Sequence, residues 1–171
     1  MFENPEVFEL HKFVDDRGEF TRLFCLDTIG LGIDAKIKHV NCSRSAHKGT
    51  VRGMHFQTSP FEEIKLITCT QGEVLDVCIN MRKNSSSFGE VHYCHLKQED
   101  SKVFLVPNGF AHGFQSLTDN SEIVYSNTAE YAKDYEINVN PLSHQIKWLE
   151  PVRNLSSKDS SSPHLSKFLK D

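Results

Sequence analysis

The segment Val74-Leu75-Asp76-Val77-Cys78-Ile79-Asn80 alternates in polarity with a period of two residues. Successive side chains of an extended strand point to opposite faces, so Leu75, Val77 and Ile79 share one face. Asp76 and Asn80 then lie on the other face. We therefore predict a β-strand here, with one apolar and one polar face.

Similar short runs of β-branched and aromatic residues occur along most of the chain. They cover residues 7–13, 19–24, 37–41, 50–56, 65–70, 90–96, 103–106, 112–117 and 122–128. Turn sequences such as Asp16-Arg17-Gly18 and Pro107-Asn108-Gly109 separate them. Many short strands without a longer internal repeat favour a closed all-β fold. We predict an all-β, jelly-roll β-barrel with a short C-terminal helix within 162–169, where Ser162-Pro163 marks a helix start.

Length and charge narrow the possible functions. With 171 residues the chain fits a single domain spanning 1–171. The 19 Lys and Arg are outnumbered by 23 Asp and Glu, and no basic face points to nucleic acid. No apolar run approaches the roughly 20 residues that cross a bilayer, so we expect no membrane association. The acidic N-terminal region is unlike a signal peptide, and we expect a cytoplasmic protein.

Polar and titratable side chains interrupt several of the predicted strands. They include Arg52, His55, Lys65, Asp76 and Tyr125. The interior of a small barrel is filled by apolar side chains or lined to hold a ligand, so this group indicates a ligand pocket. The alternative is that individual members point to solvent.

The spacing of the histidines does not favour a metal site. Barrel metal sites use two His residues two positions apart, and none of the nine His has this spacing. His92 and His95 are three apart, which places them on opposite faces of a regular strand. The cations Arg52 and Lys65 near His55 would repel a divalent ion. We predict that no metal is bound.

Several ordered motifs are similar to those of one enzyme family. They are Arg17-Gly18 with Phe20, RGMHFQ at 52–57, Lys65-Leu66, the 72–89 region, VPNGFAHGF at 106–114, Val124-Tyr125 with Tyr131, and LSSKD at 155–159. Together they resemble the dTDP-4-dehydrorhamnose 3,5-epimerase family over nearly the whole chain. The resemblance implies a cupin-like jelly-roll barrel, a homodimer with strands shared between subunits, and no cofactor or metal.

The resemblance also implies a reaction. Such an enzyme inverts C3, C5 or both in a nucleotide-diphospho-4-keto-6-deoxy sugar during deoxysugar biosynthesis. By this resemblance His55 is the general base, with Asp159 fixing its tautomer, and Tyr125 is the acid that returns a proton. Lys65 would stabilise the enolate oxygen.

Substrate-binding positions follow from the same resemblance. Arg17, Arg52 and Lys158 would bind the diphosphate, and Tyr131 would stack on the nucleotide base. The remaining pocket residues would be His39, Asn41, Asp76, His112 and Glu136.

One spacing conflicts with a regular strand. Arg52 and His55 are three residues apart, so an ideal strand would aim them to opposite faces. Both must face one pocket for the implied chemistry. We predict a bulge or local twist at Gly53 that turns both side chains inward.

Some positions depart from the family pattern. Arg22 stands where the family usually has an acidic residue, His39 where it has Gln, and the segment Val139-Asn140-Pro141 is altered. The nucleotide, the sugar and the number of inverted carbons therefore stay open. The alternatives are a sugar-nucleotide 3,4-ketoisomerase, a one-carbon epimerase, a non-catalytic carbohydrate-binding barrel and a metal-dependent oxygenase.

Overall fold

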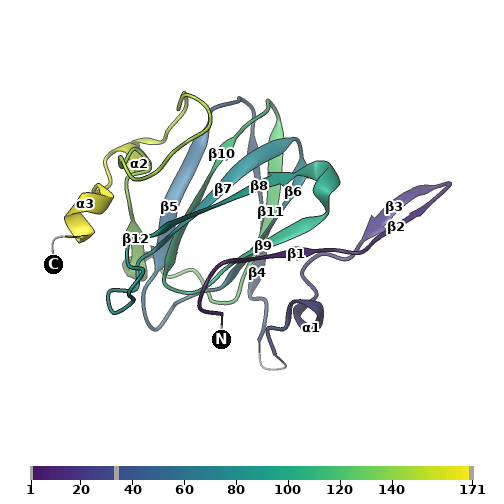
Figure 1. The fold of residues 1–171 in the computed structure, drawn as a ribbon, viewed down its shortest axis with the longest axis horizontal. Helices are drawn as coiled ribbons and strands as arrows, with labels where there is room; N and C mark the ends of the chain where they lie inside the picture. Colours follow the sequence, from purple (N-terminus) through teal and green to yellow (C-terminus); the bar gives the residue numbers. More distant parts are fainter. Residues whose placement is uncertain (1, 33–34, 170–171) are drawn as a thin grey trace.

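The computed structural model describes residues 2–32 and 35–169, and β-strands make up most of its regular secondary structure (Figure 1). The first sheet contains β1 (Glu6–Glu9), β9 (Lys102–Val106), β6 (Lys65–Gln71), β11 (Ser121–Asn127) and β4 (His39–Ser45), in that spatial order. The second contains β12 (Glu136–Asn138), β5 (Val51–Gln57), β10 (Phe110–Ser116), β7 (Glu73–Asn80) and β8 (Val91–Lys97). The strands within both sheets pair antiparallel. The predicted all-β jelly-roll class is confirmed.

Short helices and one hairpin complete the chain. The helices are α1 (Leu26–Ile29), α2 (Ser157–Ser160) and α3 (Leu165–Phe168), with 3-10 turns at Gln98–Asp100 and Lys133–Tyr135. The hairpin consists of β2 (Lys12–Asp15) and β3 (Gly18–Thr21). The predicted C-terminal helix is present as α3, and the predicted strand at 7–13 is divided between β1 and β2. None of the described helices is long and apolar enough to span a membrane.

Three apolar clusters stabilise the two sheets. One lies between the sheets and includes Ile67 and Phe104 from the first and Phe110 and Phe114 from the second. Another covers the outer face of the second sheet with the C-terminal segment. The last covers the outer face of the first sheet with the N-terminal segment. The central strands of each sheet are therefore buried on both faces, as burial of apolar surface favours, whereas Val40, Cys42 and Arg44 on the outer face of the edge strand β4 are exposed.

Strand β7 shows this double burial. Leu75, Val77 and Ile79 share one face, as predicted, and pack beneath the C-terminal segment. Asp76 and Asn80 lie on the other face and have no solvent exposure. The polar face of β7 is thus turned toward the inside of the barrel, and Asp76 comes to lie behind the pocket.

The predicted irregularity in β5 is present. His112 of β10 pairs with His55, and Phe114 pairs with Arg52, so β5 has one extra residue between the two pairs. Gly53 has φ 125°, a conformation that side chains other than glycine rarely adopt. The bulge brings Arg52 and His55 to the same pocket although they are three residues apart.

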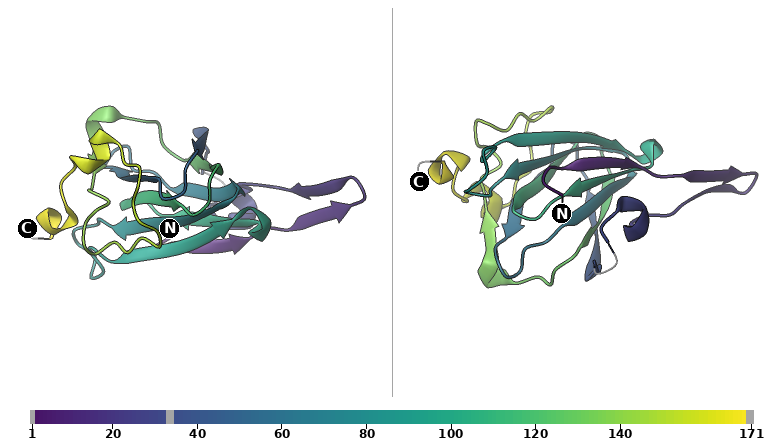
Figure 2. Two further views of the ribbon diagram at one scale, coloured as in Figure 1. Left: turned by 90° about the horizontal axis from the view of Figure 1, so that it is seen from above. Right: turned by 60° about the horizontal axis from the view of Figure 1, so that its bottom comes forward.

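The β2–β3 hairpin extends away from the barrel (Figures 1 and 2). Among the described residues, its strands pair only with each other. Phe13, Val14 and Phe20 of the hairpin are 57%, 71% and 58% exposed. An arm with this much exposed apolar surface is typical of a segment that packs against another molecule.

Candidate active site

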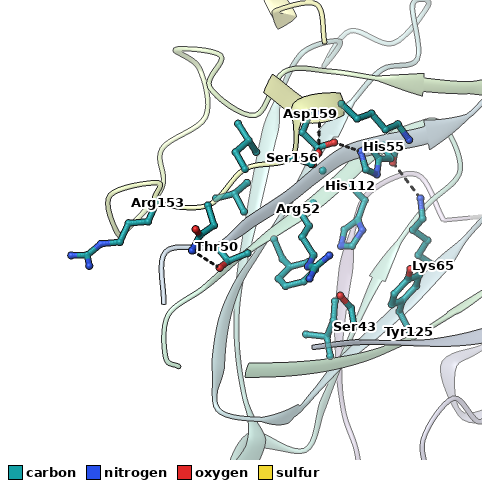
Figure 3. A pocket seen from close by; sticks show the side chains of 18 residues that line it. Ser43, Thr50, Arg52, His55, Lys65, His112, Tyr125, Arg153, Ser156 and Asp159 are labelled. Atoms are coloured by element: carbon teal, nitrogen blue, oxygen red, sulfur yellow. Dashed lines mark hydrogen bonds and ion pairs between the residues drawn. The ribbon is translucent and has the colours of Figure 1, made fainter. Parts of the chain in front are cut away.

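Two recesses open into the barrel and share the side chains of His55, Lys65 and Tyr125. The first recess has a volume of about 620 Å³ and is also lined by Arg52, His112 and Asp159 (Figure 3). The second has a volume of about 550 Å³ and is also lined by His39, Asn41, Glu63, Tyr131 and Glu136. Each is within the size range of small-molecule sites. Most of the residues predicted to act on substrate therefore line one continuous site.

His55 and Asp159 form a hydrogen-bonded pair. The His55 Nε2 donates to Asp159 Oδ1 across 2.7 Å. Asp159 is 6% exposed and His55 is 32% exposed at their side chains, so the carboxylate lies behind the ring. Burial alone would raise the pKa of Asp159, but the hydrogen bonds from His55 and Ser156 hold it below the usual value. An ionised carboxylate at Nε2 leaves Nδ1 free to accept a proton.

The C-terminal segment carries Asp159 to the barrel. Ser156 caps α2, and its Oγ accepts a hydrogen bond from the Asp159 backbone N–H at 3.0 Å. Asn140 Nδ2 donates to the carbonyls of Ser160 and Ser162 at 2.8 and 3.1 Å. Since Val139 pairs with Met54 through two backbone hydrogen bonds, Asn140 connects the strand of His55 to the turn of Asp159.

A second histidine–carboxylate pair lies beside the first. His112 Nε2 donates to Asp76 Oδ1 at 2.8 Å, and His112 lines the first recess. Asp76 is fully buried, and burial raises its pKa although His112 opposes the shift. Asp76 was expected to line the pocket. It lies behind the pocket wall instead and orients the His112 ring.

Lys65 and Tyr125 come from the opposite sheet to His55. Lys65 Nζ lies 2.7 Å from Glu63 Oε1 and donates to the His55 carbonyl at 3.3 Å. Tyr125 is on β11, next to Asn41 of β4. Burial, and then the charge of Glu63, raise the pKa of Tyr125, while Arg52 opposes the shift. The phenol therefore stays protonated through neutral pH.

Arg52 has its guanidinium at the mouth of the first recess. Its Nε donates to Ser45 Oγ at 3.3 Å, and an Nη donates to the Arg44 carbonyl at 3.0 Å. These bonds orient the group and leave other donors for an anion.

The second recess gathers the other expected binding residues. His39 and Asn41 are two residues apart on β4, so both side chains lie on its inner face. Tyr131 is 62% exposed, and its hydroxyl donates to Glu136 Oε2 at 3.4 Å. Lys158 Nζ donates to the same oxygen at 2.7 Å. Glu136 thus connects the aromatic ring to the segment that carries Asp159.

Arg17, like Asp76, is a predicted site residue that lines neither recess. It lies in the turn of the β2–β3 hairpin, where its guanidinium pairs with Asp15. The side chain is 87% exposed, on the arm that extends away from the barrel (Figure 1). Arg153 lines the edge of the first recess, but its side chain points away from the other labelled residues (Figure 3).

Sequence reasoning missed Glu63 and Asn127, which form a buried polar cluster with Gln57 under Lys65. The spacing of Glu63 and Lys65, two residues apart in an extended segment, was the available signal because such side chains share a face.

As for metal ligands, no group of three His, Cys, Asp or Glu side chains suited to an ion occurs within residues 2–32 and 35–169.

The comparisons with known proteins agree on one family. The family model described as dTDP-4-dehydrorhamnose 3,5-epimerase matches residues 2–167. A dTDP-4-dehydrorhamnose 3,5-epimerase of Shigella flexneri is 37% identical over 164 residues, covering 92% of this chain and 90% of the relative.

Solved structures show the same likeness in three dimensions. The epimerase RmlC of Legionella pneumophila, in complex with dTDP-4-keto-L-rhamnose, has a TM-score of 0.88 at 34% identity, covering 99% of this chain and 91% of that chain. A 3'-monoepimerase of Streptomyces bikiniensis, in complex with dTDP-quinovose, has a TM-score of 0.87 at 28% identity, covering 96% and 85%. This chain belongs to the dTDP-4-dehydrorhamnose 3,5-epimerase family.

Proposed function

We propose that the protein is an epimerase that inverts C3 and C5 of a dTDP-linked 4-keto-6-deoxy sugar. One observation supports this most directly. His55 on β5 and Tyr125 on β11 belong to opposite sheets and face the same cavity. Inversion requires that a proton leaves one face of the carbon and returns to the other, so a base and an acid on opposite walls suit the reaction.

The proposed steps use the chain's own residues. The 4-keto group acidifies the hydrogens at C3 and C5, and His55 takes one of them while Asp159 stabilises the resulting imidazolium. The electron pair moves onto the C4 oxygen, where the Lys65 ammonium stabilises the enolate. Tyr125 then protonates the carbon from the opposite face and becomes a phenolate. Proton exchange with solvent restores His55 and Tyr125.

Binding of the substrate follows from the charges around the cavity. Arg52 supplies a guanidinium for the diphosphate, and the exposed Tyr131 ring offers a stacking surface for the base. His39, Asn41, His112, Glu136 and Lys158 would contact the remaining polar groups. No residue in this account requires a cofactor.

We also propose a homodimer in which the β2–β3 hairpin of one subunit reaches the site of the other. Its exposed Phe13 and Phe20 would then be covered, and Arg17 would face the diphosphate. Light scattering after gel filtration tests this, because Phe13→Ser with Phe20→Ser should give a monomer with weakened substrate binding. An unchanged dimer would contradict the proposed role of the hairpin.

The five free cysteines fit a reducing compartment, and we propose that the enzyme is cytoplasmic.

The product of the reaction tests the function. Purified protein is incubated with dTDP-4-keto-6-deoxyglucose, and the sugar ring protons are followed by NMR. Inversion at C3 and C5 is the expected result. Inversion at C3 alone would indicate the second candidate, a one-carbon epimerase, which the similarity to a 3'-monoepimerase favours. A carbonyl moved to C3 would indicate a ketoisomerase, and binding without turnover a non-catalytic barrel.

A further inference from the structure

The ammonium group of Lys65 is buried together with one carboxylate. Lys65 is 7% exposed and Glu63 is 8% exposed. Their charged atoms are 2.7 Å apart, and the only other hydrogen bond of Lys65 Nζ among the described residues goes to the His55 carbonyl. A buried lysine is rarely found without such a partner, because removing an unpaired charge from water is costly.

The carboxylate of Glu63 is itself held from both sheets. Its Oε2 accepts hydrogen bonds from Gln57 Nε2 of β5 and Asn127 Nδ2 of β11, each at 3.0 Å. Gln57 is fixed in turn, since the two hydrogens of its Nε2 are shared among Glu63 Oε2 and the Phe61 and Glu130 carbonyls, and its Oε1 accepts from the Ala132 N–H. Glu63 therefore has a single position relative to the two walls that carry His55 and Tyr125.

We propose that Glu63 is a positioning residue that holds the Lys65 ammonium where the two recesses meet, so that it faces the developing enolate. This inference rests on the proposed function of the site. A lysine side chain has four flexible carbons, so its ammonium can take many positions. A hydrogen-bond donor lowers the activation barrier most when it is already in place as charge develops on the substrate. Glu63 supplies that constraint, and it also balances the charge of Lys65 beside Arg52, His55 and Tyr125.

A cycle of variants tests the proposal. Glu63→Gln keeps the shape and removes the charge, Lys65→Met removes the ammonium, and the double variant removes both. Glu122→Gln is the matched control. Glu122 is on the same strand as Tyr125 but lies outside both recesses, and the substitution breaks its ion pair with Arg44. For each protein, the rate of solvent deuterium incorporation into dTDP-4-keto-6-deoxyglucose gives kcat and KM, and thermal unfolding gives Tm.

We expect Glu63→Gln to lower kcat by about 10- to 100-fold, the size of effect that a displaced donor causes, and to change KM by less than about threefold. In the Lys65→Met background the same substitution should cause no further loss of kcat, since Glu63 acts through Lys65. Lys65→Met alone should lower Tm by leaving Glu63 unpaired, and adding Glu63→Gln should restore part of that loss. The control should behave as wild type.

Two results would overturn the proposal. One is a double variant whose loss of kcat equals the product of the losses in Glu63→Gln and Lys65→Met, which would indicate that Glu63 has a structural role separate from Lys65. The other is a double variant whose Tm is no higher than that of Lys65→Met. If the wild type itself exchanges no deuterium, the proposed function is wrong, and the Tm cycle still decides whether Glu63 fixes Lys65.

Discussion

Replacing Gly53 with alanine should damage both the stability and the activity of the protein. A Cβ at this position would lie 2.5 Å from the Gly113 Cα and 2.8 Å from the His112 carbonyl oxygen, and both are backbone atoms of β10. The φ of 125° adds backbone strain. Strain of about 1–3 kcal/mol and overpacking of about 1–3 kcal/mol sum to roughly 2–6 kcal/mol. For a chain of this length that corresponds to a Tm lowered by roughly 5–20 °C.

The activity should fall because the bulge positions the base. If the strand shifts to relieve the contact, His55 and Arg52 both move, and a displacement of about 1 Å costs on the order of 100-fold in kcat. Differential scanning calorimetry and the epimerase assay measure the two effects.

Gly30→Ala is the matched control for the Gly53 variant. Gly30 also has a positive φ, 76°, but nothing lies within 4 Å of the added Cβ. This variant should lose only about 1–2 kcal/mol from backbone strain and keep its kcat. Equal Tm and kcat for the two alanine variants would refute the argument that the bulge at Gly53 builds the site.

Other substitutions test the remaining parts of the site. Asp159→Asn should lower kcat by about 10²- to 10⁴-fold with little change in KM, because the His55 tautomer is no longer fixed; a loss below about fivefold would count against this role. Since Asp159 has a lowered pKa, its stabilising contribution is present above the ordinary 3.8 and is lost as pH falls further, so the Tm difference between wild type and Asp159→Asn should shrink in acid. Tyr125→Phe should abolish inversion while His55-dependent deuterium exchange persists. Because burial raises the pKa of Tyr125, the alkaline fall in the kcat of the wild type should lie above the ordinary tyrosine value of 10. Asn140→Ala removes two hydrogen bonds under the turn of Asp159 and should cost about 1–3 kcal/mol in denaturant unfolding, with a loss of kcat; unchanged kcat would show that Asp159 needs no such support.

Much of the fold could be predicted from local patterns. Alternation in polarity marked the strands, and the conflict between Arg52 and His55 pointed to an irregularity at Gly53 that the pairing of β5 with β10 confirms. The direction in which β7 faces was not predictable, because it depends on the C-terminal segment covering Leu75, Val77 and Ile79. Periodicity separates two faces of a strand but does not say which one a distant segment will cover.

The site was predictable where one motif carried several of its residues. His55 and Asp159 are 104 positions apart in the sequence, and the motifs alone supply no distance between them. In the structure His55 Nε2 lies 2.7 Å from Asp159 Oδ1. Glu63 was missed because an acidic residue in a short loop is ordinarily solvated, and only the packing of β5 and β11 around it shows that it is buried. The role proposed for Arg17 needs a second subunit, because within one chain this side chain lies on the hairpin that extends away from the barrel.

The most direct test of the account is proton NMR of dTDP-4-keto-6-deoxyglucose in deuterium oxide, with wild type and a folded His55→Ala variant compared at equal concentration. The C3 and C5 signals should both disappear with wild type. The variant should bind the sugar nucleotide but leave both signals in place. Exchange that continues at the wild-type rate in His55→Ala would contradict the assignment of His55 as the base, and no exchange with wild type would contradict the epimerase itself.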